Sequence, residues 1–327
     1  MMMTRSAGGD HNEPMIEALL KRPAWQVLLL ALLFPLPALA WNAGGHRLVA
    51  CIAWDLLDQQ DRAEVSRLLH QHPDYERWSK RAVEYYTVSD LERAAFIESS
   101  TWPDEIRKDG RFYSAGRDSP TTTQIGFPDM ERRSNWHYLA WPLTDAAAPH
   151  GEPVYGRIDQ AFVELPPMLG ASDEARRSYA LPWLTHLVGD AHQPLHTTLK
   201  IDAQGKQDRL GTGLSVRNPF AARPGLTTLH AYWDDLPGPG GLRGERLDDA
   251  CRTLAAAYPR PAPSTADQWL DESWQIARHS GYPPGDERVP TISAEFHESA
   301  REIAKQRVAQ AGYRLAELLR KWLGRDD

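Results

Sequence analysis

The stretch Leu181–His196 reads LPWLTHLVGDAHQPLH and combines three candidate metal ligands with a helix-ending proline. His186 and Asp190 are four positions apart, so on a helix their side chains lie on one face and can bind the same ion. Pro194 cannot continue a helix, because it lacks a backbone N–H and its ring clashes with the preceding turn. The chain is therefore expected to turn there and to bring His196 in from another direction, next to a second ion.

Further candidate ligands lie elsewhere in the chain. They are needed because a catalytic zinc ion takes about four donors, and a single His on a half-apolar helix is more often a core or surface residue than a ligand. His230 and Asp234, in TTLHAYWDDLP, repeat the spacing of four. His137 lies between two aromatic residues in NWHYLAWPL, and Asp104 precedes Arg107 by three positions in STWPDEIRKDGRFY. Together these residues predict a site for more than one metal ion.

The pair Asp104 and Arg107 allows two interpretations when taken alone. At a spacing of three on a short helix, such a pair is usually a surface ion pair. The alternative is a carboxylate that binds metal beside a guanidinium that faces a phosphate group. The spacing does not decide between them.

Residues 1–40 have the features of a secretory signal peptide. Lys21 and Arg22 precede the apolar run Val27–Phe34, and residues 38–40 read Ala-Leu-Ala, which is typical of a cleavage site. The apolar run is far shorter than the ~20 residues that a membrane-spanning helix needs, so we expect no stable membrane anchor. The sequence thus predicts a secreted or periplasmic protein.

Cleavage after residue 40 would leave a folded domain of residues 41–327 with Trp41 at its N-terminus. A free α-amine has a pKa of about 7.7 to 8 and can lose its proton to a metal ion. In WNAGGHRLVACIAWDLL a helix is expected to begin near Gly45 and to carry His46 in its first turn. The amine of Trp41 and the imidazole of His46 could therefore bind one ion.

Composition narrows the function classes. The chain has 327 residues, of which 42% are hydrophobic and 25% charged, with a formal net charge of −7. A polyanionic substrate would need local attraction, which metal cations can supply where no basic stripe exists.

Cys51 and Cys251 are the only cysteines, and their spacing leaves a disulfide and two buried thiols equally open. The sequence has no Asn-x-Ser/Thr sequon, which fits a bacterial source.

Apolar residues recur at helical spacing over most of the chain, which predicts an all-α, mainly helical fold in a single domain. A short hairpin is expected around GTGLSVRNPF, and residues 108–134 are expected to form a long surface loop. The helices expected before the last one span residues 61–71, 80–98, 155–168 and 173–193. The last helix carries apolar residues at alternating spacings of four and three, a pattern typical of a packed helical bundle.

Some finer expectations follow from the same patterns. Val83 should point inward, and Ser172 should cap the helix over residues 173–193. Pro182 should kink or restart that helix. His192 is expected to face solvent or to support a ligand from behind rather than to bind metal. Ser264 and Asp267 resemble a capping box at the start of a later helix.

These residues, in this order, resemble the S1/P1 family of zinc-dependent single-strand nucleases, which belongs to the phospholipase C/nuclease superfamily. The resemblance extends from Trp41 to the WLDES stretch near Trp269. It implies a helical bundle with a small hairpin and long loops around a cleft with three zinc ions. The implied ligands of the three ions are Asp104, His137, His186 and Asp190; Trp41 and His46 with the bridging Asp190; and His196, His230 and Asp234.

The resemblance also implies an activity. The expected enzyme is a monomeric phosphodiesterase that hydrolyses single-stranded DNA and RNA to 5′-nucleotides and also acts as a 3′-nucleotidase. Asp104 would orient the attacking water, and Arg107 would stabilise charge on the phosphate. Tyr138 would stack on an unpaired base. Ala140 stands where the family usually has Asp or Asn, so a side-chain hydrogen bond to the base is missing there.

Two other functions fit the same residues. The first is a zinc phospholipase C-like enzyme of the same fold, although the TWPDEIR stretch and Asp234 favour the nuclease. The second is a non-catalytic zinc-binding protein. Structural zinc sites close their coordination with four protein ligands, often thiolates, whereas the donors here are imidazoles and carboxylates. Open positions for water and substrate therefore favour an enzyme.

Overall fold

The computed structural model describes residues 41–87, 90–143, 151–285 and 287–324, all within one unit, Ala38–Asp327. The fold is mainly helical, as predicted. Strands form only two small two-stranded sheets in the described residues. None of the helices in these ranges is both long and apolar enough to cross a membrane. The predicted leader lies outside the described residues.

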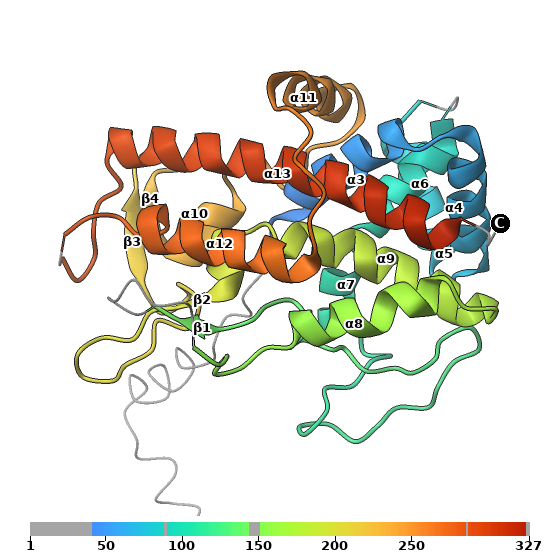
Figure 1. The fold of residues 1–327 in the computed structure, drawn as a ribbon, viewed down its shortest axis with the longest axis horizontal. Helices are drawn as coiled ribbons and strands as arrows, with labels where there is room; N and C mark the ends of the chain where they lie inside the picture. The colour runs from blue at the N-terminus through green and yellow to red at the C-terminus, as the bar shows by residue number, and fades with distance from the viewer. Residues whose placement is uncertain (1–40, 88–89, 144–150, 286, 325–327) are drawn as a thin grey trace, which may run out of the picture. The chain divides into compact units, whose positions relative to one another are not determined.

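The helices are spread along the whole described chain (Figure 1). In chain order they are α3 (Ala43–Leu56), α4 (Gln59–Gln71), α5 (Tyr75–Tyr85), α6 (Leu91–Ser99), α7 (Trp102–Glu105), the 3-10 turn η2 (Ile106–Lys108), α8 (Ile158–Leu169), α9 (Glu174–Asp190), the 3-10 turn η3 (Pro194–Thr197), α10 (Leu229–Asp234), α11 (Gly244–Ala257), α12 (Ala266–Ser280) and α13 (Ala294–Leu323).

Helices α3 and α9 lie at the centre of the core. α3 packs against α6, α9, α11 and α13, and α9 packs against α4, α7, α8 and α13. Figure 1 shows α13 lying along α3. Gly312 on α13 makes this contact close, because a Cβ there would lie only 2.6 Å from Ile52. The two central helices carry His46 and His186, so the core positions the candidate ligands directly.

Helix α3 begins slightly earlier than predicted, after Asn42. The Asn42 side chain accepts hydrogen bonds from the backbone N–H groups of Gly44 and Gly45, which satisfies donors at the helix start. Both glycines are required for packing. A Cβ on Gly44 would lie 2.4 Å from the Pro239 carbonyl oxygen, and one on Gly45 would lie 2.8 Å from Cβ of Trp41. The chain ahead of His46 is therefore held tightly.

Helix α9 differs from the prediction in two ways. Its cap is Asp173, whose carboxylate accepts hydrogen bonds from the next turn, and not Ser172. The predicted restart at Pro182 is wrong, because the helix continues unbroken to Asp190. Every residue from Ser178 to the end is buried. Packing of this helix in the core outweighs the missing backbone hydrogen bond of the proline.

Three further expectations need correction. The helix predicted over residues 80–98 is two helices, α5 and α6, and Val83 on α5 is 60% exposed. The capping box of α12 is formed by Thr265 and Gln268, one residue later than predicted. The alternation of large apolar residues in NWHYLAWPL predicts an extended buried segment, but the chain turns around His137. The only strand in this stretch is β1 (Trp141–Pro142), which pairs in parallel with β2 (Thr198–Leu199).

The predicted hairpin is confirmed, and the state of the cysteines is decided. β3 (Ser215–Asn218) and β4 (Gly225–Thr228) form an antiparallel hairpin directly before α10. Cys51 on α3 and Cys251 on α11 form a disulfide with their Cα atoms 6.3 Å apart, which decides the question that their spacing left open. The disulfide joins two segments 200 residues apart in the chain.

Candidate metal centre

Asp190 lies at the centre of the candidate site. It ends α9 and is fully buried. Its Oδ2 lies 3.0 Å from His137 Nδ1 and 3.3 Å from Nε2 of His186, one helical turn earlier. Its Oδ1 lies 3.4 Å from Nε2 of His46 on α3. The two oxygens of one carboxylate therefore face two different sets of imidazoles.

The sequence-predicted side-chain ligands form three sets in the structure. Within each set, the candidate ligand atoms lie within 4.8 Å of one another. The sets are His46, Asp104 and His186; His137, His186 and Asp190; and His196, His230 and Asp234. The structure thus brings together all the predicted side-chain donors. Cys51, Asp55 and Cys251 form a similar group, but their sulfurs are bonded to each other.

Backbone carbonyl groups fix the orientation of three of these imidazoles. The Nδ1 atoms lie 2.8 Å from Ser100 O for His186, 2.6 Å from the His137 carbonyl oxygen for His196 and 2.6 Å from Leu210 O for His230. A carbonyl only accepts, so each Nδ1 carries the proton and leaves Nε2 as the ligand atom. This arrangement is typical of metal-binding histidines.

The N-terminal segment reaches the same centre. The ring of His46 stacks on that of His186 with centroids 3.8 Å apart. Gly189 on α9 allows this approach, because a Cβ there would lie 2.8 Å from His46 Nδ1 and 3.8 Å from the Trp41 ring. The backbone N–H of Asn42 donates to the carbonyl of Asp234 at 3.1 Å. Trp41 is fully buried, and its side chain and that of His46 both lie against Gly189.

The electrostatics of the centre fit a divalent cation. Burial, followed by neighbouring charged groups, lowers the pKa of His46 and His137 well below the usual value, so both imidazoles are neutral. Burial raises the pKa of Asp190 to about 6 and that of Asp234 well above its usual value. Among the described residues, both ring nitrogens of His46, Nε2 of His137 and Oδ1 of Asp190 are buried without a hydrogen-bond partner. Neutral imidazoles and carboxylates without thiolates are a donor set that suits zinc.

Asp104 and Arg107 lie at the edge of the centre, on α7 and η2. Oδ1 of Asp104 lies 3.9 Å from both His137 Nδ1 and His186 Nε2 and accepts a hydrogen bond from Arg107 at 3.1 Å. The structure shows the ion pair that the spacing suggested, and metal binding by Asp104 stays a prediction.

Tyr138 directly follows His137 and is partly exposed. It lines a pocket of about 240 Å³ together with Arg117, Arg133 and Asn135. His192 lies outside the three ligand sets, as predicted. It is not solvent-facing, however, because it is fully buried and its Nδ1 and Nε2 lie 2.7 Å from Val188 O and 2.8 Å from Arg314.

Sequence reasoning missed Gln193. Its amide donates to Oδ1 of Asp234 at 2.8 Å, and its side-chain oxygen accepts from the backbone N–H of Leu195. Gln193 therefore connects the turn that carries His196 to the carboxylate of α10. No spacing rule identifies such a residue, because its partner is 41 positions away.

Comparison with known proteins agrees with this geometry. The family model for S1/P1 Nuclease matches residues 41–324, and the chain therefore belongs to this family. It is a nuclease, a hydrolase that acts on nucleic acid, and its three donor sets can hold the metal ions on which this class depends.

Two plant proteins are similar to this chain over most of its length, at low sequence identity. Endonuclease 5 of Arabidopsis thaliana is 24% identical over 310 residues, which cover 87% of this chain and 90% of the relative. Endonuclease 4 of Arabidopsis thaliana is 25% identical over 314 residues, which cover 87% of this chain and 89% of the relative. The likeness therefore covers nearly the whole length of both relatives.

Proposed function

We propose that this chain is an exported endonuclease that uses three zinc ions to hydrolyse single-stranded DNA and RNA to 5′-nucleotides, and that it also acts as a 3′-nucleotidase. The observation that carries the proposal is the convergence of three donor sets, two of which share His186, with Asp190 within 3.4 Å of both His46 and His186. The printed names of the two plant relatives support endonuclease action.

In this proposal each ion has its own ligands, with Asp190 shared between two of them. One ion is held by Asp104, His137, His186 and Asp190, and one by His196, His230 and Asp234. The remaining ion is held by His46, Asp190 and the amine and carbonyl of Trp41. Bound zinc supplies an activated water near neutral pH and neutralises charge on the phosphate oxygens.

Two side chains at the edge act on the reacting groups. Asp104 accepts a hydrogen bond from the attacking water and so fixes its direction towards phosphorus. Arg107 is held against Asp104 and is only 8% exposed, so its guanidinium is already ordered before substrate arrives. It donates to a phosphate oxygen as negative charge develops, a contribution worth about 10² to 10³ in rate for one such donor.

The preference for single strands follows from Tyr138. An unpaired base can stack on this ring while its phosphate meets the metal centre, and such stacking is worth about 1 to 3 kcal/mol per base. Arg117 and Arg133 in the same pocket supply positive charge for the backbone. Ala140 is buried and has no polar side-chain atom, so we expect weak discrimination between bases.

Export is supported by the leader pattern. The family match begins at residue 41, which is the residue that cleavage after Ala40 would leave first. In this proposal residues 1–40 are a signal peptide and residues 41–327 are the nuclease domain. A phospholipase and a zinc-storing protein are less well supported, because the matching family and both relatives are named as nucleases.

The test uses purified protein that starts at Trp41, loaded with zinc. Single-stranded DNA, RNA, adenosine 3′-phosphate and phosphatidylcholine are offered separately to the wild type, to Asp104→Ala and to the control Asp118→Ala, whose carboxylate is 47% exposed in the loop. We expect cleavage of the first three substrates, lost only in Asp104→Ala. Cleavage of the lipid alone, or of none of the four, contradicts the proposal.

A further inference from the structure

A second pocket borders Asp104 and is separate from the one that Tyr138 lines. It has a volume of about 420 Å³, within the range of sites that bind small organic groups. Its lining residues, which define what we call the Tyr85 pocket, are Asn42, Ala43, Arg47, Arg81, Glu84, Tyr85, Thr101, Asp104, Glu105, Lys108 and Arg243. The two pockets share no lining residue. The Tyr85 pocket includes the candidate ligand Asp104, and the other pocket includes Tyr138, the residue after His137.

Cations outnumber carboxylates in the Tyr85 pocket, although the whole chain is acidic. Arg47, Arg81, Arg243 and Lys108 face three carboxylates, one of which, Asp104, also faces the candidate metal ligands. Lys108 is exposed and ends the turn η2, directly after Arg107. Arg47 and Arg243 are paired with Glu98, and Arg81 with Glu105, so Lys108 is the cation of this pocket that is best placed to meet an anion.

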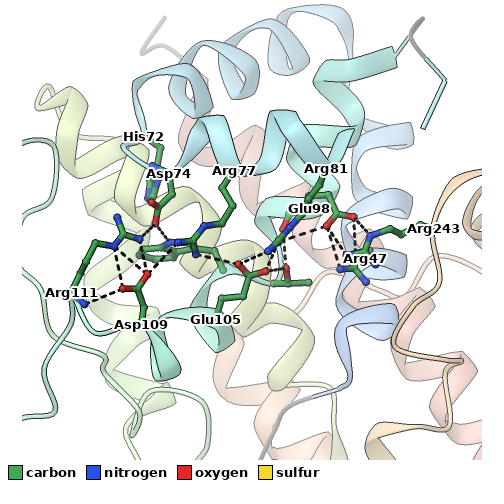
Figure 2. A network of polar contacts seen from close by, with 12 residues as sticks. Arg47, His72, Asp74, Arg77, Arg81, Glu98, Glu105, Asp109, Arg111 and Arg243 are labelled. Carbon is green, nitrogen blue, oxygen red and sulfur yellow. Dashed lines mark hydrogen bonds and ion pairs between the residues drawn. The ribbon is translucent and has the colours of Figure 1, made fainter. Parts of the chain in front are cut away.

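The guanidinium groups of this pocket are held by a carboxylate that does not line it. Glu98 is fully buried and accepts hydrogen bonds from Nε of Arg47 at 2.8 Å and from Nε of Arg243 at 2.8 Å. Figure 2 shows these side chains converging at one end of a network that continues through Arg81 and Glu105. Groups that are already ordered lose little conformational entropy when an anion binds.

Tyr85 supplies an aromatic surface in the same pocket. It ends α5, is 44% exposed, and carries the Arg243 guanidinium over its ring at 4.6 Å from the centroid. The part of the ring that is exposed offers a flat surface to a ligand in the pocket. Combined with neighbouring cations, it has the composition of a surface on which an unpaired base stacks.

We infer that the Tyr85 pocket binds a second nucleotide of a single strand, on the side of the cleaved linkage that the Tyr138 pocket does not hold. The base stacks on Tyr85, and the phosphate lies near Lys108 and Arg243. The inference rests on the proposed function, since an endonuclease has to hold the strand on both sides of the bond that it cuts.

The test measures KM and kcat for single-stranded oligothymidylates of two to eight nucleotides, and for adenosine 3′-phosphate. In the wild type, KM should fall about 5- to 100-fold at the length where the strand first reaches the pocket, as expected for one stacked base. In Tyr85→Ala and in Lys108→Ala this fall should shrink or disappear, while kcat and hydrolysis of adenosine 3′-phosphate stay unchanged. Tyr85→Phe should restore the fall, because it keeps the ring.

Matched controls lie on the same helix outside the pocket. Val83→Ala removes an exposed apolar side chain, and Lys80→Ala removes a cation whose side chain is 74% exposed. Both should behave as wild type. If KM in Tyr85→Ala and Lys108→Ala equals that of the wild type at every length, the inference is overturned and the proposed function stays intact. An equal loss on adenosine 3′-phosphate also overturns it, and a wild type that cleaves no strand refutes both.

Discussion

Two carboxylates, Glu98 and Asp190, are both fully buried, but they differ in what surrounds them. Burial alone would raise the pKa of Glu98, yet hydrogen bonds from Arg243 and Arg47 outweigh it and hold its pKa below the usual value. Around Asp190, burial outweighs the neighbouring His186, and the pKa rises to about 6. The first carboxylate is bonded to two permanently charged guanidinium groups, whereas the second faces imidazoles, among which the carboxylate raises the pKa of His186.

This difference separates a structural network from a candidate metal centre. The network in Figure 2 pairs each carboxylate with arginine, from Asp74 and Asp109 with Arg111 at one end to Glu98 with Arg243 at the other. Around Asp190 the neighbours are imidazoles, which donate lone pairs and carry no permanent charge. Asp190 and its imidazoles are therefore open to a metal cation, whereas arginine occupies the oxygens of Glu98.

The largest effect is expected for Asp190→Asn. Loss of a residue that merely supports a metal ligand costs about 10- to 100-fold in metal affinity or activity, so loss of this shared donor should exceed 100-fold in activity. Zinc content should fall as well. The metal-free variant should unfold no more easily than the metal-free wild type, because Asn removes a buried charge.

Metal analysis and thermal unfolding with and without a chelator check this prediction. The control is Asp249→Asn, which removes a carboxylate that is 72% exposed on α11. Full zinc content in Asp190→Asn would contradict it.

Glu98→Gln should have the opposite signature. It leaves the buried Arg47 and the partly buried Arg243 without their carboxylate, and breaking such a pair costs about 3 to 5 kcal/mol in the free energy of unfolding. Zinc content should not change. Denaturant unfolding measures the loss, and Glu76→Gln, at an exposed pair with Lys80, should leave the stability close to that of the wild type. A loss for Glu98→Gln as small as that of the control would refute the prediction.

Removing the disulfide should destabilise the protein without touching either carboxylate. Replacement of Cys51 and Cys251 by Ala is expected to cost about 2 to 4 kcal/mol, because the unfolded chain gains freedom over a long loop. Since α3 carries Arg47 and α11 follows Arg243, the loss should be smaller in a Glu98→Gln background. Chemical denaturation of the four proteins of this cycle measures the coupling. Strictly additive losses would show that the disulfide and the network act independently.

The smallest effect is expected for Tyr138→Ala. This residue lies beside the metal centre but donates no ligand, so zinc content and stability should be unchanged. Binding of single-stranded substrate should weaken by about 1 to 3 kcal/mol, seen as a higher KM. Tyr138→Phe, which keeps the ring, is the control. A loss of zinc in Tyr138→Ala would show that Tyr138 also supports metal binding and does not act in base stacking alone.

The sequence predicts the metal centre better than the ion-pair network because its signals are local. His186 with Asp190 and His230 with Asp234 lie one helical turn apart, so helical periodicity alone aligns them. Glu98 meets Arg47 and Arg243 across separations of 51 and 145 residues, and no pattern within either segment points to the other.

The errors in the predicted fold have a related cause. The periodicity over residues 80–98 is compatible with one helix, but α5 ends at Tyr85 and α6 begins only at Leu91. This break presents Tyr85 and Val83 to solvent instead of to the core. In α9 the reverse occurs, because burial on all sides keeps the helix intact through Pro182. Tertiary packing decides both cases, and a local pattern does not contain it.

The central claim is that the buried imidazoles and carboxylates around Asp190 hold zinc. Native mass spectrometry of the chain that starts at Trp41 tests it most directly, beside the same chain with one additional residue ahead of Trp41. The account predicts three zinc ions in the first protein and fewer in the second, which lacks the free amine at that position. A chain that starts at Trp41 and binds no zinc would contradict the account.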